Sequence, residues 1–285
     1  MKKNIHYDFW NKKAHYRRFN FWLGFRNFYF NWIYGNFQEQ RYLLKKINAI
    51  NKRGISIIDI GCATATTLRF LLNNNINNFS YTGVDLSSGM IKYCKMKYKK
   101  HKFLKTLPNI NFYKKFKKKF DLVYSRDTVL HQTDPFGFLN NLINLTGRFL
   151  IIRLRTRDVG KTELNYKKSC QKHYGNNWAP YIVINTNELL SFLKKYPKIS
   201  KITLNRSYQI LGGVNERYLP KDLYLEKTKG AETTILIEKS EKSIKNKKIK
   251  FDNDLEGHLF QFKHKYLNFI YLLINKSINF FLRKN

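Results

Sequence analysis

Two carboxylates and a glycine form the most informative chemical pattern in this sequence. Asp59 and Gly61 follow the apolar run ISII, and Asp85 ends the run YTGVD, 26 residues after Asp59. A glycine at a strand end lets the chain turn sharply and lets a ligand approach the backbone closely, because it has no Cβ. A carboxylate that ends the next strand can hold both hydroxyls of a ribose. The spacing therefore predicts a site for an adenosine-bearing cofactor.

A second group of polar residues follows the run FDLVYS, in the segment RDTVLHQTDP. Arg126, Asp127 and His131 fall at the carboxyl end of that predicted strand, the edge where open α/β sheets bind ligands. We predict His131 and Asp127 as catalytic residues, with His131 a candidate general base, and Arg126 as a substrate-binding residue. The alternative for His131 is a hydrogen bond that caps the loop or contacts the cofactor.

A long segment after the next apolar run supplies a third group. The stretch RTRDVGKTELNYKKSCQKHYGNNWAPYIV is too long and too rich in polar and aromatic residues for a simple connection. Arginines beside aromatic rings suit a sugar ring, a nucleobase or an acidic headgroup. We predict a substrate-binding set of Arg155, His173, Tyr174 and Trp178. The alternative is a lid that packs on the domain without contacting substrate.

An alternation of strands and helices would bring these groups to one edge of a sheet. Apolar runs predict strands at residues 56–59, 81–84, 110–113, 120–124 and 149–153, with helices at 66–72, 89–98 and 136–145 between them. A helix at 186–196 and strands at 199–204 and 232–238 complete the pattern. Repeated βα units indicate a parallel sheet covered by helices. We expect one doubly wound α/β domain over residues 53–240.

The two ends of the chain differ from this pattern. Residues 1–52 are aromatic and basic, and apolar side chains at helical spacing over residues 37–47 predict an N-terminal helical cap. Residues 241–285 begin as a polar, charged linker. They continue as a basic tail with an apolar stripe at Leu259, Phe262, Tyr266, Phe269, Ile270 and Leu273. Such an amphipathic helix can lie on an anionic membrane or dock on its own domain.

The charge of the chain is extreme, with 54 Lys and Arg against 19 Asp and Glu, a formal net charge of +35. This field attracts nucleic acid, anionic membranes or acidic glycans. A genome rich in A and T is the competing explanation, because Lys, Asn, Ile, Phe and Tyr share such codons. The three cysteines contain no C-x-x-C pair, so we predict neither a disulfide framework nor a metal site. Without an apolar run of signal-peptide or spanning length, we expect a cytoplasmic protein.

The motifs resemble those of the class I S-adenosylmethionine-dependent methyltransferases. Asp59, Gly61 and Asp85 match the family pattern, as do the strands FDLVYS and RFLIIRLR. The resemblance covers about residues 50–240 and implies a seven-stranded, mostly parallel sheet. It also implies S-adenosylmethionine as the cofactor, with binding residues Asp59, Gly61, Cys62, Ala63, Asp85, Leu86 and Ser125.

Three features depart from the patterns of related enzymes. Ala63 and Ala65 stand where many family members have glycine, and a Cβ restricts positive φ, so we expect a looser grip on the cofactor. The segment INFYKKFKKKF offers only lysines where the family often has an acid near the adenine. GCATATT also lacks the second and third glycines of the G-x-G-x-x-G fingerprint, which argues against a dinucleotide-binding enzyme.

The resemblance implies in-line methyl transfer to an oxygen or nitrogen acceptor. We expect a small molecule, or a glycan or lipid precursor at the cytoplasmic face of the membrane, because the aromatic segment and the basic tail fit such a substrate. An RNA methyltransferase is the alternative that the charge favours, although no RNA-binding module is evident. A non-catalytic binding protein that keeps the fold is the second alternative, motivated by Ala63 and Ala65.

Overall fold

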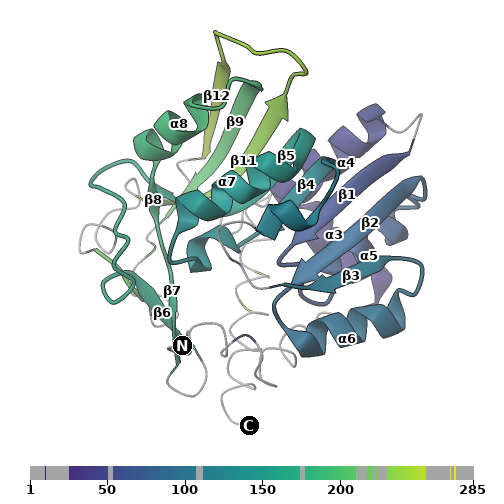
Figure 1. Ribbon diagram of the computed structural model, residues 1–285. Coiled ribbons are helices and arrows are strands. Elements are labelled where there is room, and N and C mark those ends of the chain that lie inside the picture. Colours follow the sequence, from purple (N-terminus) through teal and green to yellow (C-terminus); the bar gives the residue numbers. More distant parts are fainter. Residues whose placement is uncertain are drawn as a thin grey trace.

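The computed structural model (Figure 1) describes residues 10, 26–50, 54–106, 112–173, 177–209, 211, 217–220, 223, 230–254, 270 and 273. Its main sheet contains the strands β1 (Ile55–Ile60), β2 (Phe79–Asp85), β3 (Lys102–Lys105), β4 (Phe120–Arg126), β5 (Thr146–Arg157), β8 (Ile184–Asn185), β9 (Ile199–Tyr208), β11 (Gly230–Lys239) and β12 (Lys248–Asp254). The strand order is β12-β9-β11-β5-β4-β1-β2-β3, with β8 beside the end of β5. Only β11 runs antiparallel to its neighbours among the described strands of this sheet.

The order of the strands creates a switch point next to β1. From β1 the chain first moves outward through β2 and β3, then returns to form β4 on the other side of β1 and continues to β5. In doubly wound sheets the crevice at the carboxyl ends of the strands around such a reversal is the usual ligand site. The fold therefore places the ends of β1, β2 and β4 around one crevice.

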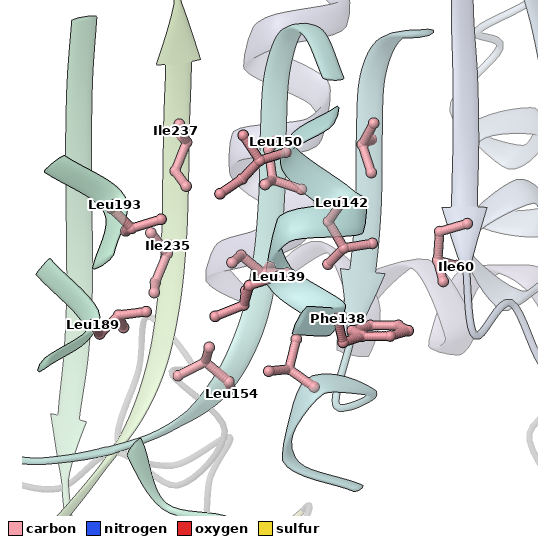
Figure 2. Close-up of a cluster of buried hydrophobic side chains, with 14 of the residues drawn as sticks. Ile60, Phe138, Leu139, Leu142, Leu150, Leu154, Leu189, Leu193, Ile235 and Ile237 are labelled. Atoms are coloured by element: carbon pink, nitrogen blue, oxygen red, sulfur yellow. The ribbon is translucent and has the colours of Figure 1, made fainter. Parts of the chain in front are cut away.

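Helices cover both faces of the sheet because its strands are apolar on both sides. One face carries α7 (Pro135–Leu145) and α8 (Thr186–Lys194), and the other carries α4 (Gln38–Ile50), α5 (Thr66–Asn73) and α6 (Ser88–Lys97). Ile57 and Ile58, adjacent on β1, point into the two different cores, as the alternation of a strand requires. Figure 2 shows the first core, where α7 and α8 face β5 and β11 through Leu139, Leu142, Leu189, Leu193, Leu150, Ile235 and Ile237.

Local sequence signals fix where several helices begin. The Asp134 carboxylate accepts the amide of Gly137 at 2.9 Å, and Pro135 occupies the first turn of α7. The Asn185 side chain caps α8 by accepting the amides of Asn187 and Glu188 at 2.9 and 3.0 Å. These caps set the directions in which the helices return across the sheet.

The mostly parallel sheet is confirmed, but two details of the prediction are wrong. The third strand is β3 at Lys102–Lys105, whereas residues 112–115 form a 3-10 helix, η2 (Phe112–Lys115). The sequence does not predict β3, because this edge strand of four residues buries only one side chain deeply, that of Phe103, and so has no apolar run. Among the described residues the sheet has nine strands rather than seven, because β8 and β12 extend it.

The segment predicted as a charged linker also contains structure. Residues 248–254 form β12, which pairs in parallel with β9 from Lys248 opposite Lys201 to Asp254 opposite Ser207. Its composition is polar because it is an edge strand, in which Ile249 packs against the core while Lys248, Lys250 and Phe251 are exposed. The predicted amphipathic tail beyond residue 254 lies outside the described residues, apart from Ile270 and Leu273.

The described part of the predicted N-terminal cap consists of α3 (Asn27–Gly35) and α4. α4 packs on β5 and β11, and α3 packs on α5. Among the residues whose structure is described, no helix combines the length and the apolar character needed to span a bilayer.

Candidate active site

The turn after β1 approaches β4 so closely that its first residue is required to be glycine. Gly61 has φ +79°, and a Cβ at this position would clash with the Thr128 hydroxyl. The amides of Gly61 and Cys62 both donate to the carbonyl oxygen of Val84 on β2, at 2.8 and 3.1 Å. The turn is therefore fixed between the ends of its two neighbouring strands.

Ala63 and Ala65 adopt the left-handed backbone that glycine would favour. Their φ values are 48° and 59°, so the turn keeps its shape without the missing glycines. A left-handed conformation costs an L-residue roughly 1–2 kcal/mol. The alanines thus impose a conformational cost, while the amide of Ala63 remains directed at Asp85. Whether they weaken the grip on a cofactor stays a prediction.

Asp85 ends β2 directly beside this turn, as the spacing predicted. Its two carboxylate oxygens accept the amides of Ala63 and Ser87 at 2.9 and 2.8 Å. Burial raises the pKa of Asp85, and the amides of Ser87, Ala63 and Leu86 oppose that rise. Each carboxylate oxygen can accept two hydrogen bonds, so each Asp85 oxygen has room for a hydroxyl besides its backbone amide.

Asp59 lies beneath the turn rather than on its surface. Its side chain accepts a hydrogen bond from the Tyr81 hydroxyl at 2.7 Å and another from Thr67 on α5. Burial raises the pKa of Asp59 to about 7, against the opposing effect of these hydrogen bonds. This carboxyl group ties β1, β2 and α5 together below the crevice.

Three other predicted cofactor residues also surround the turn. The Cys62 and Cys94 thiols are buried and both donate to the carbonyl of Ala63, at 3.8 and 3.3 Å. The Ser125 hydroxyl donates to the carbonyl of Ile60 at 3.0 Å. Leu86 is half-buried and follows Asp85 directly. Cys62 and Ser125 therefore use their side chains to shape the backbone of the turn.

A buried charge cluster stands at the ends of β4 and β5. It contains three arginines and three acids, which are Glu39, Arg126, Asp127, Arg153, Arg155 and Glu232. Arg153 is fully buried and pairs with Glu232, Glu39 and Asp127. Arg155 lies 2.7 Å from Asp127 and 2.8 Å from Glu232. Arg126 pairs with Glu39 at 2.9 Å and lies over the Phe37 ring.

Membership of this cluster restricts the roles of the predicted residues within it. Burial alone would raise the pKa of Asp127. The positive charges of Arg153, Arg155 and Arg126 instead hold this pKa well below its usual range. A carboxylate with so low a pKa is a poor general base near neutral pH. The guanidinium of Arg155 is almost fully buried between two acids. Asp127 and Arg155 therefore form an ion pair with each other, which limits their availability to a substrate.

His131 has a different environment, at the end of the 3-10 helix η3 (Val129–His131). Its Nδ1 lies 2.8 Å from the carbonyl oxygen of Pro180, which can only accept, so Nδ1 carries the proton and Nε2 the lone pair. Burial lowers the pKa of His131 to about 4, although the Pro180 carbonyl and Asp127 oppose this shift. The ring is thus neutral at physiological pH.

Two aromatic rings outside the predicted substrate-binding set lie beside this histidine. The ring centroids of Trp10 and Tyr181 lie 4.9 and 6.2 Å from that of His131. Tyr181 is buried, and its hydroxyl has no hydrogen-bond partner among the described residues. The guanidinium groups of Arg217 and Arg155 lie over its ring, at 4.5 and 5.9 Å from the centroid. No local motif marks Trp10 or Arg217, because each is far from His131 in sequence.

The comparison with known families agrees with this geometry. Residues 58–147, from β1 through the Gly61 turn and His131 to the start of β5, match the family described as "Methyltransferase domain". Over these residues the chain is therefore similar to a methyltransferase domain. No curated protein matches the sequence.

Solved structures share the fold of this chain at very low sequence identity. Magnesium protoporphyrin IX methyltransferase from Synechocystis PCC 6803, with S-adenosylhomocysteine bound, has 12% identity and a TM-score of 0.50, covering 83% of this chain and 100% of that one. The N-terminal domain of EvdMO1, also with S-adenosylhomocysteine bound, has 7% identity and a TM-score of 0.50, covering 71% of this chain and 82% of that one.

Beyond the family match, three short strands form a second, smaller sheet. Its antiparallel strands are β6 (Cys170–His173), β7 (Asn177–Pro180) and β10 (Arg217–Tyr218). The predicted substrate residue Trp178 is exposed on β7, with its ring 5.1 Å from that of Tyr218. The side chain of His173 and all of Tyr174 lie outside the described residues. Within the described ranges, no cluster of His, Cys, Asp and Glu could hold a metal ion.

Proposed function

We propose that the methyltransferase domain binds S-adenosylmethionine at the carboxyl ends of β1 and β2 and transfers its methyl group to an oxygen or nitrogen of a small molecule. Glycan and lipid precursors belong to the same proposal. The observation that carries it is the Asp85 carboxylate, tied to the amides of Ala63 and Ser87 beside the Gly61 turn. This arrangement joins a ribose acceptor to a turn that a ligand can approach closely.

The residues of the chain would divide the work around the cofactor. Asp85 would accept the ribose hydroxyls, while Asp59, Cys62 and Ser125 keep the turn in place from below. S-adenosylmethionine supplies a methyl group on a positively charged sulfur, so the protein mainly has to align the acceptor for in-line attack. His131 would take the proton from an acceptor hydroxyl or amine at Nε2, because its neutral tautomer presents a lone pair there.

The surroundings of His131 support a small acceptor with an apolar body. Trp10 and Tyr181 supply aromatic surface, and the buried Tyr181 hydroxyl is a polar group that an acceptor could satisfy. Charged groups nearby are largely committed to the buried charge cluster. An acceptor would thus be oriented by ring contacts and a few hydrogen bonds.

Calorimetric titration with S-adenosylmethionine tests the cofactor site. We expect Asp85→Ala to weaken binding by about 1.5–3 kcal/mol, because it removes a charged hydrogen-bond acceptor. Asp121→Asn is the matched control, since Asp121 also accepts two hydrogen bonds, from the Ser56 amide and hydroxyl, at the opposite edge of the sheet. Unchanged affinity in a folded Asp85→Ala protein would contradict the assignment of the cofactor site.

A separate experiment addresses the methyl acceptor. Radiolabelled cofactor incubated with the protein and fractionated cell extract would show which class of molecule receives the methyl group.

A further inference from the structure

Positive charge gathers at the edge of the main sheet opposite the candidate active site. This edge is formed by the starts of β4, β5, β9 and β12 and, because it runs antiparallel, the end of β11. We call its basic residues the lysine edge: Lys117, Lys118, Lys119, Arg148, Lys194, Lys195, Lys198, Lys201, Lys239, Lys242, Lys245, Lys247 and Lys248. In Figure 1 the loop from β11 to β12 marks this edge at the top, away from β6 and β7.

Contacts between distant segments show that these residues are neighbours in space. The amides of Ser240 and Ile244 donate to the carbonyls of Lys198 and Pro197, at 2.8 and 2.7 Å. The Lys239 ammonium donates to the carbonyls of Ile143 and Thr146, at the end of α7. Burial, together with the charges of Lys119 and Lys198, lowers the pKa of Lys239 to about 8. Basic residues from three parts of the sequence therefore repel one another here.

The acidic residues of the chain do not balance this edge. At the opposite edge Arg126, Arg153, Arg155 and Arg206 are each paired with an acid. Three acids accompany the thirteen basic residues of the lysine edge: Asp121, Glu238 and Glu241. Asp121 is occupied by Ser56, and Glu238 pairs with Lys46 and Lys201. Ten of the thirteen basic side chains are exposed.

We propose that the lysine edge is a docking surface for an anionic membrane. Lysines near such a surface contribute about 1 kcal/mol each, without needing a fixed geometry. Twelve of the thirteen basic residues are lysines, whereas nucleic-acid sites favour arginine for bidentate phosphate contacts. Single-stranded RNA is also bound by several exposed aromatic rings. Among the described residues of the strands that form this edge, Phe251 on β12 is the only exposed aromatic side chain, and its ring centroid lies 5.0 Å from the Arg206 guanidinium.

This placement has a geometric consequence for the enzyme. The Gly61 turn follows the carboxyl end of β1, whereas the lysine edge lies at the starts of the parallel strands β4 and β5, so the two lie at opposite edges of the sheet. A domain docked through the lysine edge holds its active site away from the lipid, toward the aqueous side. This orientation favours the water-soluble members of the proposed acceptor class, which arrive from solution while the enzyme stays at the membrane surface.

Vesicle sedimentation of the full chain tests the proposal with two variants of equal net charge. The edge variant carries Lys→Gln at Lys117, Lys118, Lys195, Lys198 and Lys245. The control variant carries Lys→Gln at five exposed positions elsewhere, Lys92, Lys95, Lys161, Lys167 and Lys168. With mixed phosphatidylserine and phosphatidylcholine vesicles, we expect the edge variant to lose at least about tenfold in partitioning and the control to change by less than about threefold.

Two outcomes would overturn the inference. Equal losses in both variants would mean that total charge, rather than its placement, drives binding. The wild-type chain could instead fail to bind the vesicles. If it then binds polyuridylic acid and the edge variant does not, the surface is a site for RNA. Neither readout depends on methyl transfer, so the result is separable from that of the cofactor titration.

Discussion

His131 and Asp127 lie four residues apart, and burial favours the neutral form of both, yet only His131 is neutral. Three arginines keep Asp127 ionised, whereas His131 faces the Pro180 carbonyl through Nδ1 and is neutral. The sequence suggested both as catalytic residues because both follow one strand. It could not separate them, since the pairing of Asp127 with Arg153 and Arg155 depends on contacts between strands. Asp85 was easier to place, because a strand end fixes its position.

The lowered pKa of His131 predicts a loss of stability in acid. The unfolded histidine has a pKa near 6.5 and the folded one about 4, so protons bind the unfolded chain more tightly. The stability that the neutral ring contributes is present above pH 6.5 and is lost as the pH falls toward 4. We expect His131→Asn, which keeps an N–H donor for Pro180, to unfold with a shallower pH dependence in that window. The urea midpoint of each protein is measured across this pH range. Midpoints that change equally with pH in both proteins would contradict this assignment.

At the scale of elements, the buried charge cluster joins parts that no sequence motif connects. Glu39 on α4 contacts Arg126 on β4 and Arg153 on β5, while Glu232 on β11 contacts Arg153 and Arg155. The strands themselves were predictable from their apolar runs. The edge strands β3 and β12 were not, because an edge buries too few side chains to produce a recognisable pattern.

Removing one acid from the cluster should therefore destabilise the whole domain. We expect Glu39→Gln to cost about 3–5 kcal/mol, because it leaves three arginines with two acids and so one uncompensated positive charge in the cluster. Glu238→Gln is the comparison, since its pair with Lys46 is partly exposed and should contribute at most about 1 kcal/mol. Denaturant unfolding measures both. Similar small costs for the two substitutions would show that the cluster does not hold α4 to the sheet.

Across the whole molecule, the net charge of +35 is divided unevenly. Arg126, Arg153 and Arg155 near the active site are paired with acids, and the surplus lies mainly on lysines, many of them at the lysine edge. Composition revealed the size of this surplus but not its location. The location follows from strand direction, since the antiparallel β11 brings Lys239 to the same edge as Lys119 and Lys198.

Self-repulsion of this surplus should make the stability of the domain depend on salt. We expect the melting temperature to rise with sodium chloride and to level off as the screening length falls from about 10 Å at 0.1 M to about 3 Å at 1 M. The edge variant, with five fewer charges there, should show a smaller rise than the wild type. A melting temperature that falls with salt, or equal rises in the two proteins, would argue against repulsion at this edge.

The exact balance of the buried charge cluster also constrains how this protein can change over time. Three arginines and three acids contact one another, so a single substitution that removes the charge of one member leaves an unpaired charge in the protein interior. Related chains should either inherit positions 39, 126, 127, 153, 155 and 232 as one set or exchange several of them together for apolar residues. Covariation among these six positions would thus mark descent from a common ancestor more clearly than the short motifs at the cofactor turn.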